Sequence, residues 1–477
     1  MTIDDAPAPS RRAHRDAVAA STGENVVASD SDAIVVRNAR GRRALGWLED
    51  GAVAARTTPG TEIAPDLLAR RPHRSPLRPG VVVPILSGLG LMGAYAATTL
   101  LWPLWAVAPH IEPAAVSDLV GAPTAVVWPA EGSAAVGVAG IDATPASTGD
   151  AVPMASITKL VTALMVLDEM PLAVGESGPS FTFDENDRET YYEDLAEDES
   201  ALDVPVDGSL SQYQMLQGML IGSAGNYADR LASTIWPTDT VFAKAARAWL
   251  DRKNLPGITV VEPTGIDPAN AADPASLITL ARLALADPVI AEIVRTSVVD
   301  LPGAGQVVNT NDLLADPSVV GLKTGSLTDL YNLLAAKVQP VGDTTVRVYA
   351  VALAQPDDAA RDSDTARLLN EVAAEASVPT TLPTGTIVGT VTTKWGATAQ
   401  VVTTGDLSLL LWNAQTAPVT SDLALGDART AGAEVGTVST KGPLDTASTS
   451  AHLTADLPDP DAWWRLTHPL QLFGLAD

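Results

Sequence analysis

The stretch Met154 to Met165 reads MASITKLVTALM, and it holds the only Ser-x-x-Lys sequence in the 477 residues. In an α-helix, positions three apart lie on one face, so the Ser156 hydroxyl and the Lys159 amine can touch. A serine hydroxyl is a weak nucleophile without a base, and a lysine with a lowered pKa can be that base. The apolar residues that follow predict a buried helix with Ser156 at its N-terminal end. An ordinary helix start, with a capping serine and a solvated lysine, is the alternative.

The amino-acid composition of the chain excludes several kinds of catalytic site. It contains no cysteine, and its five histidines leave residues 111–451 without one. A Ser-His-Asp triad, a thiol nucleophile and a histidine-based zinc site are therefore excluded from the central region, which leaves lysine as the natural base. The formal charge of −27 argues against nucleic acid as a partner, because phosphate binding needs a basic face.

The N-terminal region divides into a polar tail and an apolar run. Residues 1–79 carry twelve arginines against ten acidic residues and predict a disordered cytoplasmic tail. Residues 80–108 contain no charge and are long enough to cross a bilayer, with arginines directly before them. We expect an uncleaved single-pass helix in the cell membrane with the rest of the chain outside. A cleaved signal peptide is the competing interpretation, since Ala106-Val107-Ala108 has the form of a cleavage site.

The remaining chain predicts two domains. In residues 115–378, strands are expected at 124–128, 134–138, 319–325, 332–338 and 345–354, and helices at 211–220, 242–252, 276–286 and 364–376. The first two strands are expected to pair as a hairpin. The acidic run 181–206 is expected to be a solvated face. Residues 380–477 predict a small all-β module with strands at 386–394, 399–403, 407–412 and 434–439.

Two further short motifs follow the first. Ser223-Ala224-Gly225-Asn226 lies between two apolar helical stretches, and Lys323-Thr324-Gly325 ends a strand. Each alone is typical of an ordinary turn or strand end. Together and in this order, Ser-x-x-Lys, a middle serine motif and Lys-Thr-Gly resemble penicillin-binding proteins and serine β-lactamases. The closer resemblance is to serine-type D-alanyl-D-alanine carboxypeptidases, and it covers residues 115–378.

This resemblance implies an α+β fold, with an antiparallel sheet flanked by helices and a helical subdomain. It implies that Ser156 attacks the D-Ala-D-Ala bond of peptidoglycan stem peptides, that Lys159 takes the proton and that Ser223 relays it. Lys323 and Thr324 would bind the terminal carboxylate beside Gly325, and the N–H groups of Ser156 and Ser326 would form the oxyanion hole. No metal or cofactor is implied, and β-lactams would be covalent inhibitors.

The middle motif departs from the family's Ser-x-Asn, because its third residue is Gly225 and the asparagine comes one position late. We expect Asn226 to reach the same space through a different turn and to join the catalytic residues. Two alternatives stay open: a β-lactamase, and a non-catalytic penicillin- or peptidoglycan-binding protein.

Overall fold

The computed structural model describes residues 78–476, so almost all of the expected cytoplasmic tail at 1–79 lies outside the described residues. The first element is helix α1, Pro79–Leu101, whose 23 residues are almost all exposed and include an 18-residue window with a mean hydropathy of 1.7. Its length and composition suffice to cross a membrane. The helix is shorter than the expected span of 80–108. It ends before Pro103, because proline disfavours the helical conformation in the residue that precedes it.

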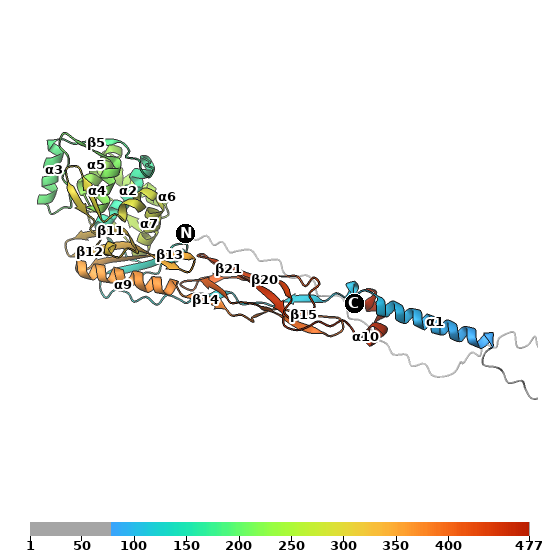
Figure 1. Ribbon diagram of the computed structural model, residues 1–477. Helices are drawn as coiled ribbons and strands as arrows, with labels where there is room; N and C mark the ends of the chain where they lie inside the picture. The colour runs from blue at the N-terminus through green and yellow to red at the C-terminus, as the bar shows by residue number, and fades with distance from the viewer. Residues whose placement is uncertain (1–77, 477) are drawn as a thin grey trace, which may run out of the picture. The chain divides into compact units, whose positions relative to one another are not determined.

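The central sheet has four antiparallel strands in the order β11-β12-β13-β3 (Figure 1). Their bounds are Val319–Leu327, Leu330–Val341, Thr344–Gln355 and Ser133–Val138. These strands confirm the expectations at 134–138, 319–325, 332–338 and 345–354.

The expected hairpin partner at 124–128 is not a strand, so that prediction is wrong. Two of its backbone N–H groups donate to carboxylates instead of to a neighbouring strand. Ala125 N–H donates to Glu375 at 2.8 Å, and Val127 N–H donates to Glu371 at 3.1 Å. Residues 124–128 therefore have the apolar pattern of a strand, but they form an extended segment that lies against the helix carrying Glu371 and Glu375.

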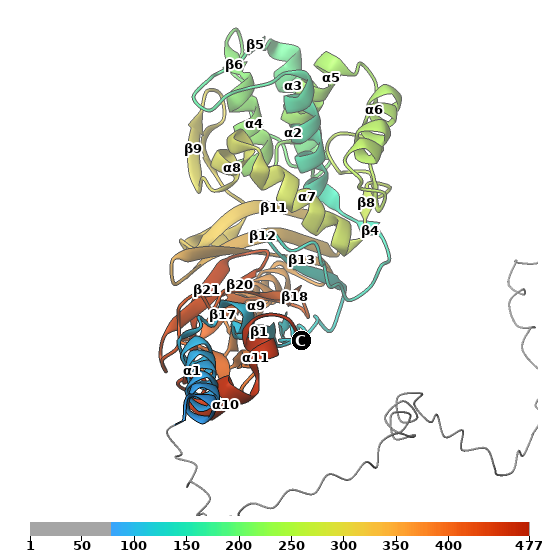
Figure 2. The ribbon, with the colours of Figure 1, turned by 90° about the vertical axis from the view of Figure 1, so that its right-hand side faces the viewer.

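The two faces of this sheet are covered by different helices (Figures 1 and 2). Along β13, Val346, Val348 and Ala350 pack in the core that includes helix α9, Asp358–Ala376. The alternate residues Tyr349, Val351 and Leu353 pack in the larger core with α7, Pro274–Ala286. This alternation follows from the period of two along a strand. The fold is α+β, as the sequence predicted.

The helical subdomain is built around α2, Thr158–Glu169, which is buried on all sides from Thr158 to Leu167. Helices α4, Gln212–Ile221, and α6, Asp239–Arg252, confirm the predictions at 211–220 and 242–252. The acidic run contains helix α3, Glu185–Ala196, which has no buried residue and so presents a solvated surface. The surrounding helices are α3 Glu185–Ala196, α4 Gln212–Ile221, α5 Gly225–Ile235, α6 Asp239–Arg252 and α8 Pro288–Val294. Short strands β4 to β10 are Val152–Pro153, Ser180–Thr182, Ser209–Ser211, Ile258–Thr259, Ala271–Ala272, Val298–Leu301 and Gly305–Val308.

The C-terminal region forms a six-stranded sheet in the order β1-β15-β16-β21-β20-β19. Strand β1, His110–Pro113, comes from before the central sheet and pairs antiparallel with β15, Ile387–Thr392. The other four are β16 Thr398–Thr403, β21 Thr446–Leu453, β20 Glu434–Lys441 and β19 Val419–Leu423. Two smaller sheets pair β14 Pro379–Leu382 with β17 Leu407–Leu410, and β2 Leu119–Val120 with β18 Thr416–Ala417. The chain ends with the short helices α10, Ala462–Thr467, and α11, Pro469–Leu472.

Candidate active site

Ser156 and Lys159 are hydrogen bonded in the structure. Ser156 lies in a 3₁₀ turn, Ala155–Ile157, that leads directly into α2. Lys159 Nζ donates to Ser156 Oγ at 3.0 Å and to the backbone oxygen of Thr264 at 2.7 Å. Only 3% of the Lys159 side chain is exposed, which excludes an ordinary helix start with a solvated lysine. The serine therefore has a potential base within hydrogen-bond reach.

The surroundings of Lys159 favour its neutral form. Burial lowers the pKa of the amine from 10.5 to about 8, against the opposing charges of Glu262, Asp229 and Glu199. A neutral amine has a lone pair that can accept the serine proton, whereas an ammonium cannot. The helix thus places a hydroxyl beside an amine with a pKa of about 8, a pair that can act as nucleophile and base.

The turn at 262–270 holds the carbonyl that Lys159 contacts, a role that the sequence analysis did not assign to it. The buried Glu262 carboxylate accepts hydrogen bonds from the backbone N–H groups of Thr264 at 2.6 Å and Gly265 at 2.7 Å. It also accepts one from the amide of Asn270, which is completely buried. Gly265 has a φ of +89°, and a side chain there would overlap the Ala155 carbonyl. This turn packs directly against the residue before Ser156.

Strand β11 brings Lys323, Thr324 and Gly325 to the same site. Lys323 is 1% exposed, and its Nζ donates to Ser223 Oγ at 3.0 Å. Burial, followed by the nearby charges of Lys159 and Arg361, lowers the pKa of Lys323 well below its usual value. A Cβ atom on Gly325 would lie 2.9 Å from the Met154 oxygen and 3.0 Å from the Ser156 nitrogen. Glycine is needed there because the strand passes so close to the nucleophile turn.

Ala155, which directly precedes Ser156, and the predicted site residue Ser223 both have backbone conformations that are uncommon for residues other than glycine. Ala155 has a φ of +51° and Ser223 a φ of +61°. Such left-handed conformations cost free energy and concentrate at functional sites, where the surrounding structure holds them in place. Here they direct Ser156 toward Lys159 and Ser223 toward Lys323.

The Ser156 side of this site borders a cleft of about 720 Å³. Ser156 and Lys159 lie in it with Thr264 and Gly265, and Ser326 comes from the end of β11. Three acidic residues, Glu197, Asp198 and Glu199, line it as well. The structure thus brings together Ser156, Lys159, Ser223, Lys323, Thr324, Gly325 and Ser326, seven of the eight predicted site residues.

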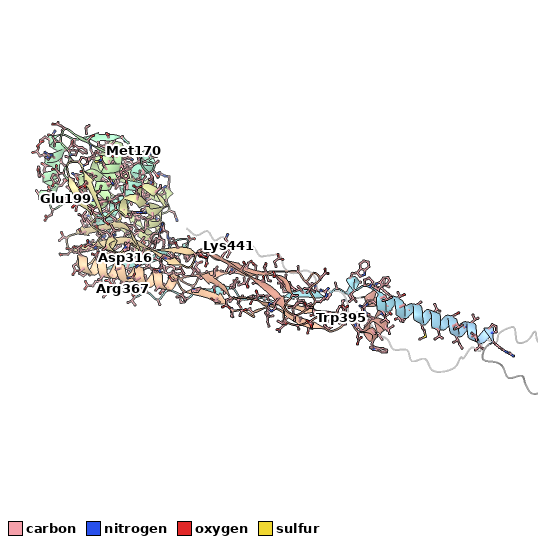
Figure 3. All side chains as sticks on the ribbon, viewed as in Figure 1. Met170, Glu199, Asp316, Arg367, Trp395 and Lys441 are labelled. Atoms are coloured by element: carbon pink, nitrogen blue, oxygen red, sulfur yellow. The ribbon has the colours of Figure 1, made fainter. Side chains whose placement is uncertain are left out.

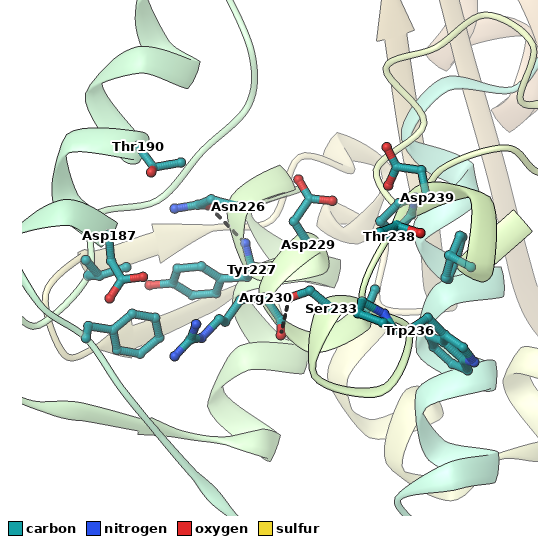
Figure 4. A pocket seen from close by; sticks show the side chains of 16 residues that line it. Asp187, Thr190, Asn226, Tyr227, Asp229, Arg230, Ser233, Trp236, Thr238 and Asp239 are labelled. Carbon is teal, nitrogen blue, oxygen red and sulfur yellow. Dashed lines mark hydrogen bonds between the residues drawn. The ribbon is translucent and has the colours of Figure 1, made fainter.

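Asn226 is the residue that the structure does not bring to this cleft, which corrects our expectation for it. Its side chain binds the backbone of Leu202 twice, accepting from N–H at 3.2 Å and donating to the carbonyl at 2.8 Å. It lines a second cavity of about 410 Å³ with Asp187, Tyr227 and Asp229 (Figure 4). Successive helix positions differ by about 100°, so a residue at 226 cannot point where one at 225 would.

Comparison with known families agrees with this geometry. Residues 146–355 match the family described as D-alanyl-D-alanine carboxypeptidase. This part of the chain is a domain of that family. The match includes the Ser-x-x-Lys, middle-serine and Lys-Thr-Gly motifs, and D-alanyl-D-alanine carboxypeptidase activity is the function that the family indicates for this domain.

Several solved structures are similar to the chain. The Streptomyces K15 DD-transpeptidase is 22% identical, covers 52% of this chain and 98% of its own, and has a TM-score of 0.44. Penicillin-binding protein 5 from Haemophilus influenzae is 17% identical, with coverages of 70% and 100% and a TM-score of 0.47. The D-alanyl-D-alanine carboxypeptidase DacD from Francisella tularensis is 16% identical, with coverages of 72% and 97% and the same score. No curated protein matches the chain.

Proposed function

We propose that this protein removes the terminal D-alanine of peptidoglycan stem peptides through an acyl-enzyme on Ser156. The observation that carries the proposal is the 3.0 Å hydrogen bond from the buried Lys159 amine to Ser156 Oγ. In the reaction, neutral Lys159 takes the hydroxyl proton as Ser156 Oγ bonds to the carbonyl carbon of the D-Ala-D-Ala peptide bond. The tetrahedral intermediate then breaks its bond to nitrogen, and that nitrogen leaves as the amine of D-alanine after accepting a proton.

Ser223 and Lys323 have supporting roles in this proposal. Ser223 relays the proton to the leaving amine, since its oxygen accepts a hydrogen bond from Lys323 and its own hydrogen is free to donate elsewhere. Lys323 and Thr324 bind the terminal carboxylate of the substrate. The N–H groups of Ser156 and Ser326 stabilise the oxyanion, where each such donor can contribute about 3 kcal/mol. Water then hydrolyses the ester and returns Ser156 to its free form.

A membrane location completes the proposal. Helix α1 carries no charged residue, and the arginines at 70, 71, 74 and 78 precede it in the sequence. By the positive-inside rule, its N-terminal side faces the cytoplasm and residues 102–477 lie outside, where peptidoglycan is found. β-Lactams, which acylate the same serine, are the expected covalent inhibitors.

The test is D-alanine release from a stem pentapeptide ending in D-Ala-D-Ala. We expect release by the wild-type chain and none by Ser156→Ala. Ser233→Ala is the matched control, because Ser233 is exposed and lines the second cavity. Equal release by wild type and Ser156→Ala would refute the proposal. Incubation of the same proteins with penicillin separates a carboxypeptidase, which stays acylated, from a β-lactamase, which turns the antibiotic over.

A further inference from the structure

Glu262 is a buried carboxylate to which the proposed reaction gives no role. It is 9% exposed, and one turn brings five hydrogen-bond donors to it. Four of the donors are N–H groups of the backbone or of the Asn270 amide, and the fifth is the Thr264 hydroxyl. All five donate, and an ionised carboxylate is the form that accepts from all of them. The turn therefore holds a fixed negative charge in a buried position.

One peptide group joins this charge to the base. The carbonyl of Thr264 accepts a hydrogen bond from Lys159 Nζ at 2.7 Å, and the N–H of Gly265, in the same peptide group, donates to Glu262 at 2.7 Å. Lys159 Nζ also lies 3.0 Å from Ser156 Oγ, so these groups form one continuous chain of hydrogen bonds. In such a chain each hydrogen bond polarises the next, and a buried site strengthens the effect. The charge of Glu262 thus makes the Thr264 oxygen a better acceptor for the lysine.

The turn that carries this peptide group is attached to α2 at a second point. Thr162 Oγ1 donates to the Pro263 oxygen at 2.7 Å. Because Lys159 and Thr162 are three positions apart on the helix, both contacts come from one face of it and fix the orientation of the turn toward the base. A nucleophile, its base and a third group that orients the base are the general design of an activated serine.

Other charged groups face Lys159 from the neighbouring elements. Burial lowers its pKa to about 8, and the charges that oppose this shift are, in decreasing order, those of Glu262, Asp229 on α5 and Glu199 after α3 (Figure 3). Lys323 on β11 carries a like charge and repels it. Among the residues that the structure describes, Glu262 is the one acid of these three that is joined to Lys159 through hydrogen bonds.

We propose that Glu262 is a positioning residue for the acylation of Ser156, whose charge acts through the peptide group between Thr264 and Gly265 to stabilise the ammonium form of Lys159. At this step the proton leaves Ser156 Oγ and stays on Lys159 Nζ, and Glu262 takes none. This inference rests on the function proposed above and adds a residue to the same site. Glu262 has the part of the buried acid that stabilises the protonated base in a serine-histidine-aspartate triad.

The experiment removes the charge and keeps the size of the side chain. The second-order rate of labelling by a fluorescent penicillin is measured between pH 5.5 and 9.5 for the full chain and for Glu262→Gln. Without the carboxylate the ammonium is less stable, so the half-maximal rate should move to lower pH. The limiting rate at high pH should fall about tenfold, the value of one hydrogen bond to a charged group.

Two further variants separate the charge from the structure of the turn. Asn270→Ala removes one donor from the same carboxylate but leaves its charge, so it should melt at a lower temperature and keep the half-maximal pH of wild type. Glu262→Asp keeps the charge on a side chain one methylene shorter, which breaks the hydrogen bond to Gly265. It should keep a half-maximal pH close to that of wild type and have a lower limiting rate, and it carries the test if Glu262→Gln does not fold.

The outcomes separate the inference from the function beneath it. Identical profiles for wild type and Glu262→Gln would overturn the inference, as would an equal shift in Asn270→Ala or a wild-type limiting rate in Glu262→Asp. Labelling of the wild-type chain without release of D-alanine from a stem pentapeptide would overturn the proposed function and leave the role of Glu262 in acylation standing. No labelling of wild type would overturn both.

Discussion

The pH dependence of Ser156 acylation follows from the burial of Lys159. The pKa of this amine is lowered to about 8, so roughly a tenth of it is neutral at pH 7. With the usual pKa of 10.5 the neutral fraction would be about 0.03%, so burial raises the concentration of active base by roughly 300-fold. Because the deprotonated form is the base, the acylation rate should rise about tenfold per pH unit below pH 7 and level off above pH 8.

The assay is the second-order rate of labelling by a fluorescent penicillin between pH 5.5 and 9.5, a range in which the carboxylate of the antibiotic does not titrate. Lys159→Ala should label at a rate that is low and independent of pH across the same range. A wild-type rate that is flat with pH, or one that still rises about tenfold per pH unit at pH 9.5, would refute the assignment of Lys159 as a base with a lowered pKa.

Three substitutions test other parts of the site. Gly325→Ala places a methyl group about 3 Å from the Ser156 nitrogen and should reduce penicillin labelling at least 100-fold, whereas Gly149→Ala, which has open space around it, should label normally. Gly225→Asn restores the amide at the family's position, but its Cβ atom would lie only 3.3 Å from the Ser200 oxygen, so kcat/KM for D-alanine release should not rise above that of wild type; an increase would count against this geometry. Asn270→Ala leaves the Val261 N–H without its partner and removes one donor from the buried Glu262, so it should lower the free energy of unfolding by about 2 kcal/mol, seen as a lower melting temperature; an unchanged value would contradict the role of this turn.

The order of polar and apolar residues within a segment predicted those helices and strands whose structure depends mainly on that segment. The buried helix after Ser156, the strand that ends in Lys-Thr-Gly and most helices of the subdomain were predicted from periodicity alone, because burial of one face imposes that periodicity. The spacing of three between Ser156 and Lys159 was likewise sufficient to predict their contact. The segment 124–128 shows where prediction from local patterns fails. Its sequence pattern is that of a strand, but the pattern does not reveal whether the backbone N–H groups bind another strand or two carboxylates on α9.

Features that depend on distant parts of the chain could not be predicted in this way. Strand β1 pairs with β15, which lies about 280 residues later, and no local signal indicates that partner. The role of Glu262 arises from five hydrogen-bond donors that one turn brings to its carboxylate. Asn226 was placed in the catalytic cleft by analogy with a motif, although its position one residue further along the helix turns it toward Leu202.

The most direct test of the account is to label the full-length protein with penicillin and locate the modified residue by mass spectrometry of its proteolytic peptides. We expect one adduct, on Ser156, that disappears in Ser156→Ala. An adduct on another serine, or no adduct in the wild-type protein, would contradict the claim that Ser156 is the nucleophile.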